Sequence, residues 1–445
     1  MKKKNGGTRR NRKTTRKRKI IRTKKAYDIN FRGGDLSSDG GAILLQQADK
    51  MLRLSEQISE TIKDPRKQSQ TEHSMLDMVR QRLYAIALGY EDLNDHSSLR
   101  KDQVLQALLR KDSELASAST LCRFEQYADR DAMVKMSQIL LEHFISSHKK
   151  PPAQIILDFD GTDDQTHGNQ EGSFFHGYYD HYCFLPLYVF CDDFPLVAYL
   201  RPSSQDGAKH ALAILSLLVK HIRAHWPNTK IIFRADSGFC RHQLFDWCER
   251  SDVNFICGIA INKRLERLAE PYISRAKEYF DHTQEKQRIF ADIEYAAKSW
   301  KRSRRIIVKA EHLAKGANPR FVVSNLEGDA QALYERLYCA RGDMENRIKE
   351  QQLGLFADRT SCHKWWPNQF RLLLSTCAYV LFAYIRRVGL SGTEYAKAQA
   401  STIRLRFLKI GCIVISNTRR VRFMLSSAYP LQRTFLSALA KFTPW

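Results

Sequence analysis

The stretch Ile155–Asp164, IILDFDGTDD, places four aspartates within ten residues, and its first half is apolar. Such a run predicts a buried β-strand. Because side chains alternate along a strand, Asp158 and Asp160 share one of its faces. Carboxylates are costly to bury unless they are paired or bind a metal ion. The strand therefore indicates a site, but alternation alone does not choose between the two acids.

The residues that follow this strand predict a mixed β-sheet. Pro151 and Pro152 end a helical region just before it. Beyond it, two apolar runs joined tightly form a hairpin, and two helices then alternate with two strands; these segments are 183–193, 194–202, 207–226, 229–239, 241–251 and 253–260. Three meander strands followed by helical crossovers predict an α/β fold with a mixed sheet.

Three acids stand where this sheet would bring them together. Asp160 ends the first strand, Asp236 ends the fourth, and Glu345 lies on a long predicted helix at 329–352. Clustered carboxylates repel one another, and Mg²⁺ or Mn²⁺ relieves that repulsion. Two such ions can carry out phosphodiester transfer. Taken singly, each aspartate also fits an ordinary turn, and Glu345 fits an ion pair with Lys349.

The composition favours a nucleic-acid partner. The 445 residues include 72 Lys and Arg against 48 Asp and Glu, a formal net charge of +24, which suits a polyanion. The ten cysteines form no CxxC pair, so reduced thiols in a cytosol are expected. The most apolar run, 370–385, is shorter than the roughly 20 residues of a membrane span, which predicts a buried helix.

Changes in composition divide the chain into six segments. They are a basic arm at 1–26, a helical DNA-binding region at 27–150, an α/β core at 151–261, a β-rich insertion at 262–330, the second part of the core at 331–390, and a C-terminal α/β segment at 391–445. The arm is expected to be disordered when free. It is either a solubilising tail or a contact to DNA phosphates through residues that include Arg9, Arg10, Arg16, Lys17, Arg18 and Lys19.

Three motifs resemble those of DDE transposases of bacterial insertion sequences. They are DGT at 160–162, ADSGF at 235–239, and the Y-x-x-R-x-x-x-E pattern of Tyr338, Arg341 and Glu345. Residues 158–187 and 341–350 are most similar to the IS-thirteen-eighty branch. The resemblance implies an RNase H-like catalytic domain that a β-rich insertion interrupts.

The resemblance also implies roles for individual residues. Asp160, Asp236 and Glu345 would be catalytic and would bind two Mg²⁺ or Mn²⁺ ions, while Tyr338 and Arg341 would contact DNA. The wider family pattern has a lysine where this chain has Gln352, and Lys349, on the same helix face, is the candidate DNA contact in its place. Trp300, in a basic segment, would either stack on an unpaired base or pack against the sheet.

The implied function is DNA recombination. A transposase of this kind binds the terminal inverted repeats of its element, cleaves at the ends as an endonuclease, and transfers the 3′-OH to double-stranded target DNA. It would act as a homodimer on the nucleoid, in the bacterial cytoplasm. Two alternatives are an RNase H-like nuclease that only hydrolyses DNA and a catalytically inactive DNA-binding repressor; the complete set of three acids argues against the repressor.

Overall fold

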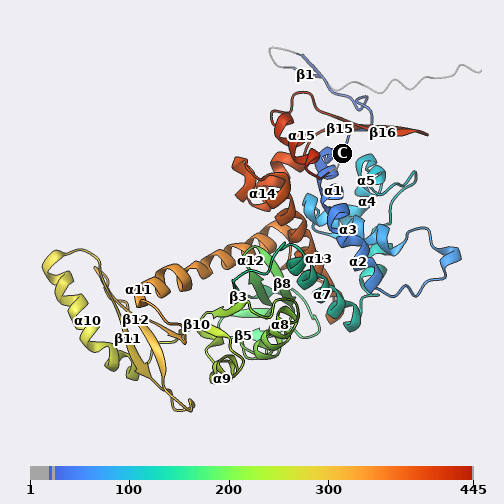
Figure 1. Ribbon diagram of the computed structural model, residues 1–445. Helices are drawn as coiled ribbons and strands as arrows, with labels where there is room; N and C mark the ends of the chain where they lie inside the picture. The colour runs from blue at the N-terminus through green and yellow to red at the C-terminus, as the bar shows by residue number, and fades with distance from the viewer. Residues whose placement is uncertain (1–19, 23–25, 443–445) are drawn as a thin grey trace, which may run out of the picture.

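The computed structural model describes residues 20–22 and 26–442, so the arm residues Arg9 to Lys19 lie outside it. Figure 1 shows a central sheet with helices on both faces, the N-terminal helices beside it, and a yellow module that extends away from the body. Within the described residues all ten cysteines are free.

The central sheet has nine strands and mixed directions, as predicted. Along its main path the order is β11-β12-β14-β10-β9-β3-β7-β8, and β13 pairs with β12. Strands β3, β9 and β10 are parallel. Strand β7 runs antiparallel to β3, and β8 pairs antiparallel with β7 in a hairpin, so β8 runs in the direction of β3. The bounds are β3 Gln154–Gly161, β7 Leu187–Cys191, β8 Phe194–Tyr199, β9 Lys230–Ala235 and β10 Asn254–Ile259.

Helices cover the two faces of this sheet differently. On one face, Leu157, Phe159 and Phe233 pack with α8 (Ala211–His225) and α9 (His242–Arg250) in a common core. The other face lies under a helical run made of α11 (Ala330–Ala332), a π-helical segment η5 (Leu333–Tyr338), a 3₁₀ turn η6 (Cys339–Arg341) and α12 (Gly342–Leu355). A regular helix was predicted here. The wider π turns alter the spacing of side chains just before Glu345.

The segment predicted as a β-rich insertion begins with a long helix instead. Helix α10 spans Lys263–Thr283, and few of its side chains are buried, notably Leu265, Ala269 and Ala276. That apolar stripe is too sparse for periodicity to reveal the helix. The strands that follow, β11 Gln287–Tyr295, β12 Arg304–Leu313, β13 Gly316–Ala317 and β14 Arg320–Ser324, extend the central sheet because β14 pairs with β10.

The N-terminal helices share a hydrophobic core with the C-terminal part of the chain. They are α1 Ile43–Leu52, α2 Leu54–Thr61, α3 Met75–Leu88, α4 His96–Leu99, α5 Gln103–Leu108, α6 Ala118–Glu125 and α7 Arg130–Ser146. They pack with α13 (Trp365–Tyr384), α14 (Ala400–Ile403) and α15 (Gln432–Ala440). The boundaries expected at 150 and 390 therefore do not separate independent cores.

Two short ribbons and one long apolar helix are further features of the fold. A two-stranded ribbon, β15 (Cys412–Asn417) with β16 (Arg420–Leu425), lies near the C-terminus, and β1 (Ile20–Arg22) pairs with β2 (Ala26–Asp28). Among the described residues one helix, Trp365–Gly389, has the length and the mean hydropathy, 1.3, of a membrane span. Its most apolar window is 78% buried inside the protein, as predicted for a core helix.

Candidate active site

The structure brings Asp160 and Glu345 together around one guanidinium. Asp160 lies at the end of β3, and Glu345 lies in the first turn of α12. Arg341 donates from Nη1 to Asp160 Oδ2 at 3.3 Å and from Nη2 to Glu345 Oε1 at 2.5 Å. Because α12 crosses the sheet face that carries Asp160, residues 181 positions apart in sequence meet there.

Asp236 completes the group from the neighbouring strand. It follows β9, and the parallel register that pairs Phe159 with Ala235 places it beside Asp160. Its Oδ1 accepts a hydrogen bond of 2.9 Å from Gly238 N, which turns the chain immediately after the acid. The aspartate is therefore held at the carboxyl edge of the sheet, as the sequence predicted.

The electrostatics of the group favour a bound cation. Burial raises the pKa of Asp160 to about 7, Arg341 opposes that rise, and the negative charges of Asp236 and Glu345 add to it. Three carboxylates face one arginine, so negative charge is left uncompensated. Carboxylate oxygens are the ligands that Mg²⁺ and Mn²⁺ prefer, and the donor set thus fits the ions that the sequence implied.

Asp158 has a different partner. Arg234 on β9 donates to both of its carboxylate oxygens, and the Nη2–Oδ2 distance is 2.6 Å. Arg234 also donates to the carbonyl oxygen of Leu337 in η5. The buried pair thus joins β3, β9 and the helical run, and Asp158 is a positioning residue.

Tyr338 lies over β10, beside the loop that carries Asp236. A Cβ atom on Gly258 would come within 2.5 Å of the Tyr338 hydroxyl oxygen and 2.9 Å of Ser237 N. Glycine at this point of β10 therefore makes room for the tyrosine. Sequence reasoning missed Gly258, although an isolated glycine within a strand is a recognised signal of close approach.

Gln352 stabilises the loop after Asp160. Its Nε2 donates to Asp163 O and to Asp164 Oδ1, both at 3.0 Å. Asp164 is buried, and that burial raises its pKa to about 8. The hydrogen bond that Gln352 donates opposes this rise in pKa, and glutamine thus holds the loop without adding a charge. Lys349, the candidate substitute for the missing lysine, is exposed on α12.

Trp300 packs within the protein. Its ring lies 5.9 Å from that of Phe245 and 5.5 Å from that of Tyr295, and the Arg304 guanidinium carbon is 5.2 Å from its centroid. Of the two roles that the sequence left open, the contacts support packing.

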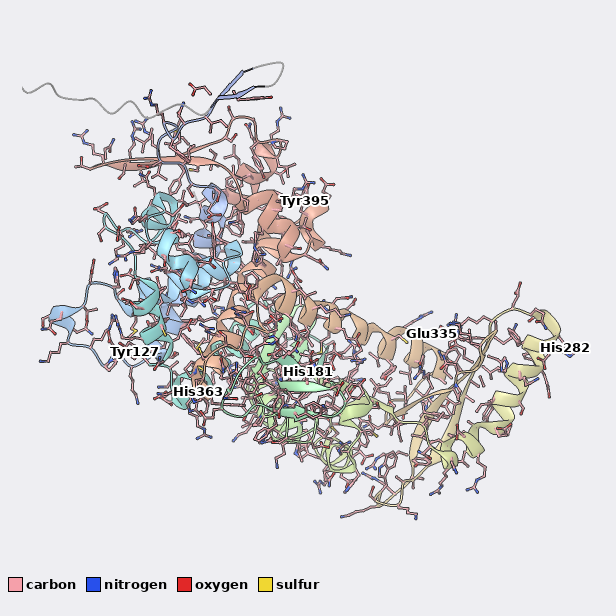
Figure 2. The ribbon with its side chains drawn as sticks, turned by 180° about the vertical axis from the view of Figure 1, so that it is seen from behind. Tyr127, His181, His282, Glu335, His363 and Tyr395 are labelled. Atoms are coloured by element: carbon pink, nitrogen blue, oxygen red, sulfur yellow. The ribbon has the colours of Figure 1, made fainter. Side chains whose placement is uncertain are left out.

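Exposed aromatic side chains lie on a small three-stranded sheet whose first strand follows the loop after Asp160. It consists of β4 (Asp164–Gln165), β5 (Phe174–His176) and β6 (His181–Phe184). Phe175 and Tyr182 face each other across β5 and β6 with ring centroids 5.8 Å apart, and they are 53% and 58% exposed. His181, labelled in Figure 2, anchors β6 through a 2.7 Å contact with Asp163. Sequence reasoning did not single out these aromatics.

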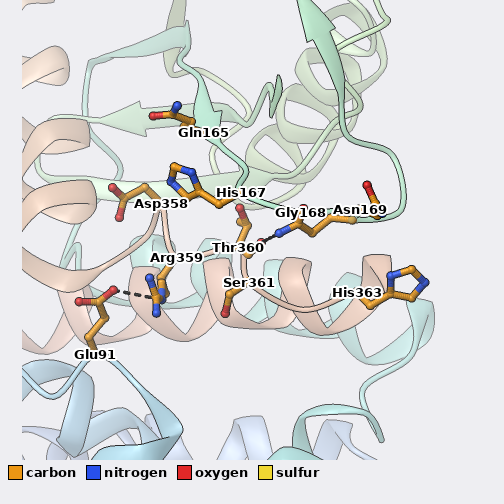
Figure 3. Close-up of a pocket in the computed structure, with 11 residues that line it drawn as sticks. Glu91, Gln165, His167, Gly168, Asn169, Asp358, Arg359, Thr360, Ser361 and His363 are labelled. Atoms are coloured by element: carbon orange, nitrogen blue, oxygen red, sulfur yellow. Dashed lines mark hydrogen bonds and ion pairs between the residues drawn. The ribbon is translucent and has the colours of Figure 1, made fainter. Parts of the chain in front are cut away.

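A separate cavity is lined in part by the loop that follows β4, as Figure 3 shows. It has a volume of about 550 Å³, and none of the three acids lines it. Glu91 and Arg359, 3.1 Å apart, form an ion pair on its wall. The cavity is thus distinct from the site formed by Asp160, Asp236 and Glu345.

Comparison with known proteins then decides the family. A family model described as transposase DDE domain group 1 matches residues 20–444. This chain belongs to the DDE transposase family. That membership implies that this DDE transposase is a DNA-cleaving enzyme.

This DDE transposase was also compared with solved structures and with curated proteins. A solved structure similar to it is the cryo-EM structure of a piggyBac transposase synaptic complex with hairpin DNA. The two are 11% identical with a TM-score of 0.40, over 93% of this chain and 87% of that one. No curated protein matches it significantly.

Proposed function

We propose that this chain is the transposase of a bacterial insertion sequence of the IS-thirteen-eighty branch. It binds the terminal inverted repeats of its element, cleaves at the ends and transfers the 3′-OH to target DNA. The observation that carries this proposal is the convergence of Asp160, Asp236 and Glu345 on Arg341 at one sheet edge. The strand order β8-β7-β3-β9-β10 is the order expected of an RNase H-like core.

The chain's own residues prepare the site for phosphodiester chemistry. Asp160, Asp236 and Glu345 would hold two Mg²⁺ or Mn²⁺ ions, which when bound activate a nucleophilic oxygen and stabilise the leaving one. Arg341 lies among the acids, and its planar fork is suited to a phosphate oxygen once cations compensate the carboxylates. The Asp158–Arg234 pair fixes the strand and the helical run relative to each other.

The exposed face of Phe175 and Tyr182 is the surface we assign to unpaired bases at a cut end. Bases stack on aromatic rings irrespective of sequence, and the loop that carries Asp163 ties these rings to the catalytic strand. Lys349 and Tyr338 remain proposed DNA contacts. The active form is proposed to be a homodimer on DNA, in the bacterial cytoplasm.

Purified protein, an oligonucleotide duplex carrying the inverted repeats that flank its gene, and a target plasmid test the proposal. With Mg²⁺ we expect cleaved ends and joined products, and we expect neither with Asp236→Asn. Cleavage without joining would indicate the hydrolytic nuclease. Binding of the repeats without cleavage by the wild-type protein would indicate a repressor.

A further inference from the structure

A group of histidines and one acid lies on helices away from the three catalytic candidates. Glu142 on α7 and His221 and His225 on α8 each offer a donor atom, and these atoms all lie within 4.8 Å of one another. Glu142 Oε1 is 2.8 Å from His221 Nε2. We propose that these three residues bind one transition-metal dication, with Zn²⁺ as the ion that fits best. The proposal is independent of the proposed function.

The two histidines are placed for joint ligation. They stand four positions apart on one helix, so they share a face, and their ring centroids are 5.0 Å apart. His225 Nδ1 is 3.1 Å from the carbonyl oxygen of His221. A ring that donates its Nδ1 proton to that carbonyl keeps a lone pair on Nε2, which is how metal-binding histidines are commonly oriented.

The donor set selects a different ion from the one expected at the sheet edge. Two imidazoles and a carboxylate, with water in the fourth position, are a common zinc environment. Three carboxylates favour Mg²⁺ or Mn²⁺ instead. Millimolar Mg²⁺ should therefore compete poorly for the Glu142–His221–His225 site, and this contrast allows the two sites to be measured separately.

The neighbouring charges leave the group open to an ion. Arg223, on the same helix, directs its guanidinium to the carbonyl oxygens of Ser251 and Asp252 at 2.6 and 2.7 Å. Glu142 and His225 are exposed and His221 is partly exposed. A cation from solution can thus reach Glu142 and His225 without displacing an arginine, whereas His221 Nε2 is itself buried beside the Glu142 carboxylate.

The position of the group gives the ion a structural role. His225 is the last residue of α8, and β9 begins at Lys230 and ends just before Asp236. At about 3.3 Å per residue, the length of β9 separates this site from the catalytic edge. An ion here therefore cannot take part in cleavage.

Helix α7 connects two cores, and an ion would fix it to α8. Leu140 packs in the core of the N-terminal helices, whereas Leu141 and Phe144 pack in the core of the sheet. The Phe144 ring lies 5.3 Å from that of Trp226, which follows α8. Binding would therefore tie the N-terminal helical region to the catalytic sheet.

Zinc titration of the chelator-treated full-length protein tests the site. With 5 mM MgCl₂ present in the assay, we expect one Zn²⁺ per chain by calorimetry and a rise in melting temperature, because a ligand that binds only the folded state stabilises it. His225→Ala is the decisive variant, since His225 is exposed and the Glu142–His221 contact survives without it. We expect it to weaken Zn²⁺ binding at least about tenfold.

His242→Ala on α9 serves as the matched control, and it should bind Zn²⁺ as the wild-type protein does. An Asp160→Asn/Asp236→Asn background removes the catalytic acids as competing ligands and should also keep the binding. Stoichiometric binding unchanged in His225→Ala, or no binding by the wild-type protein in the presence of Mg²⁺, would overturn the proposal.

Discussion

Two arginine–carboxylate contacts lie on the same face of β3, two residues apart. They differ in burial and in the number of carboxylates that share the arginine. In the Asp158–Arg234 pair the side chains are 6% and 7% exposed and share two hydrogen bonds. In the Asp160–Arg341 contact they are 13% and 18% exposed, and Arg341 is shared with Glu345. The inner pair, Asp158 with Arg234, carries no net charge, and both of its side chains are buried. The outer group, Asp160, Asp236 and Glu345 with Arg341, has more carboxylates than arginines. We infer that the ratio of acids to arginines, and not the presence of a buried acid, distinguishes a structural pair from a candidate cation site.

The largest expected effect concerns the outer group. Asp160→Asn, Asp236→Asn or Glu345→Gln should each lower end cleavage by more than ~100-fold, since even the outer partners of metal ligands commonly contribute 10- to 100-fold. Cleavage of labelled repeat duplexes measures this, and circular dichroism verifies folding. Any of the three variants that retained wild-type cleavage would remove that acid from the site.

The inner pair should affect stability instead. Asp158→Ala leaves Arg234 buried without its partner, which should lower the free energy of unfolding by about 3–5 kcal/mol in urea titrations. Cleavage per folded molecule should largely persist. The double variant Asp158→Leu/Arg234→Met removes both charges and should be less destabilised than Asp158→Ala. Full loss of cleavage with unchanged stability in Asp158→Ala would reverse the roles assigned to the two aspartates.

A third acid of the same stretch, Asp164, should make stability depend on pH. Its pKa is raised to about 8 by burial, so the folded state binds its proton more tightly than the unfolded state. This contribution to stability is complete below pH 4 and is lost as pH rises through 8. Asp164→Asn should therefore lose less stability between pH 5 and pH 9, by on the order of 4 kcal/mol. Thermal unfolding measures the difference, and Asp343→Asn, at an exposed position of α12, is the control that should retain the wild-type slope.

The smallest effect is expected at the aromatic face outside the carboxylate group. Phe175→Ala and Tyr182→Ala should each weaken binding of a single-stranded dT₁₂ oligonucleotide by about fivefold or more, because stacking contributes roughly 1–3 kcal/mol per base. Fluorescence anisotropy measures the affinity. Tyr279→Ala, which removes an exposed aromatic on α10, is the control. Equal affinities in all three variants would show that unpaired bases bind elsewhere.

Local patterns were enough to predict the central part of the fold. Alternation along 155–160, the tight hairpin after it and the helix–strand repeats to residue 260 predicted the mixed sheet. The three acids were found by their place at strand ends and on the later helix, together with the motif resemblance. Helix α10 was missed because its stripe of buried residues is sparse, and the sharing of one core by α1–α7 and α13 depends on contacts between distant segments.

The sequence by itself determined that Asp158 and Asp160 share a strand face, because the period of a strand is a local property. Only the tertiary structure gave them different partners. Arg234 comes from a neighbouring strand 76 positions away and closes on Asp158, while Arg341, 181 positions away, joins Asp160 to Glu345. Pairing and burial depend on which segments pack together, and no pattern within ten residues contains that information.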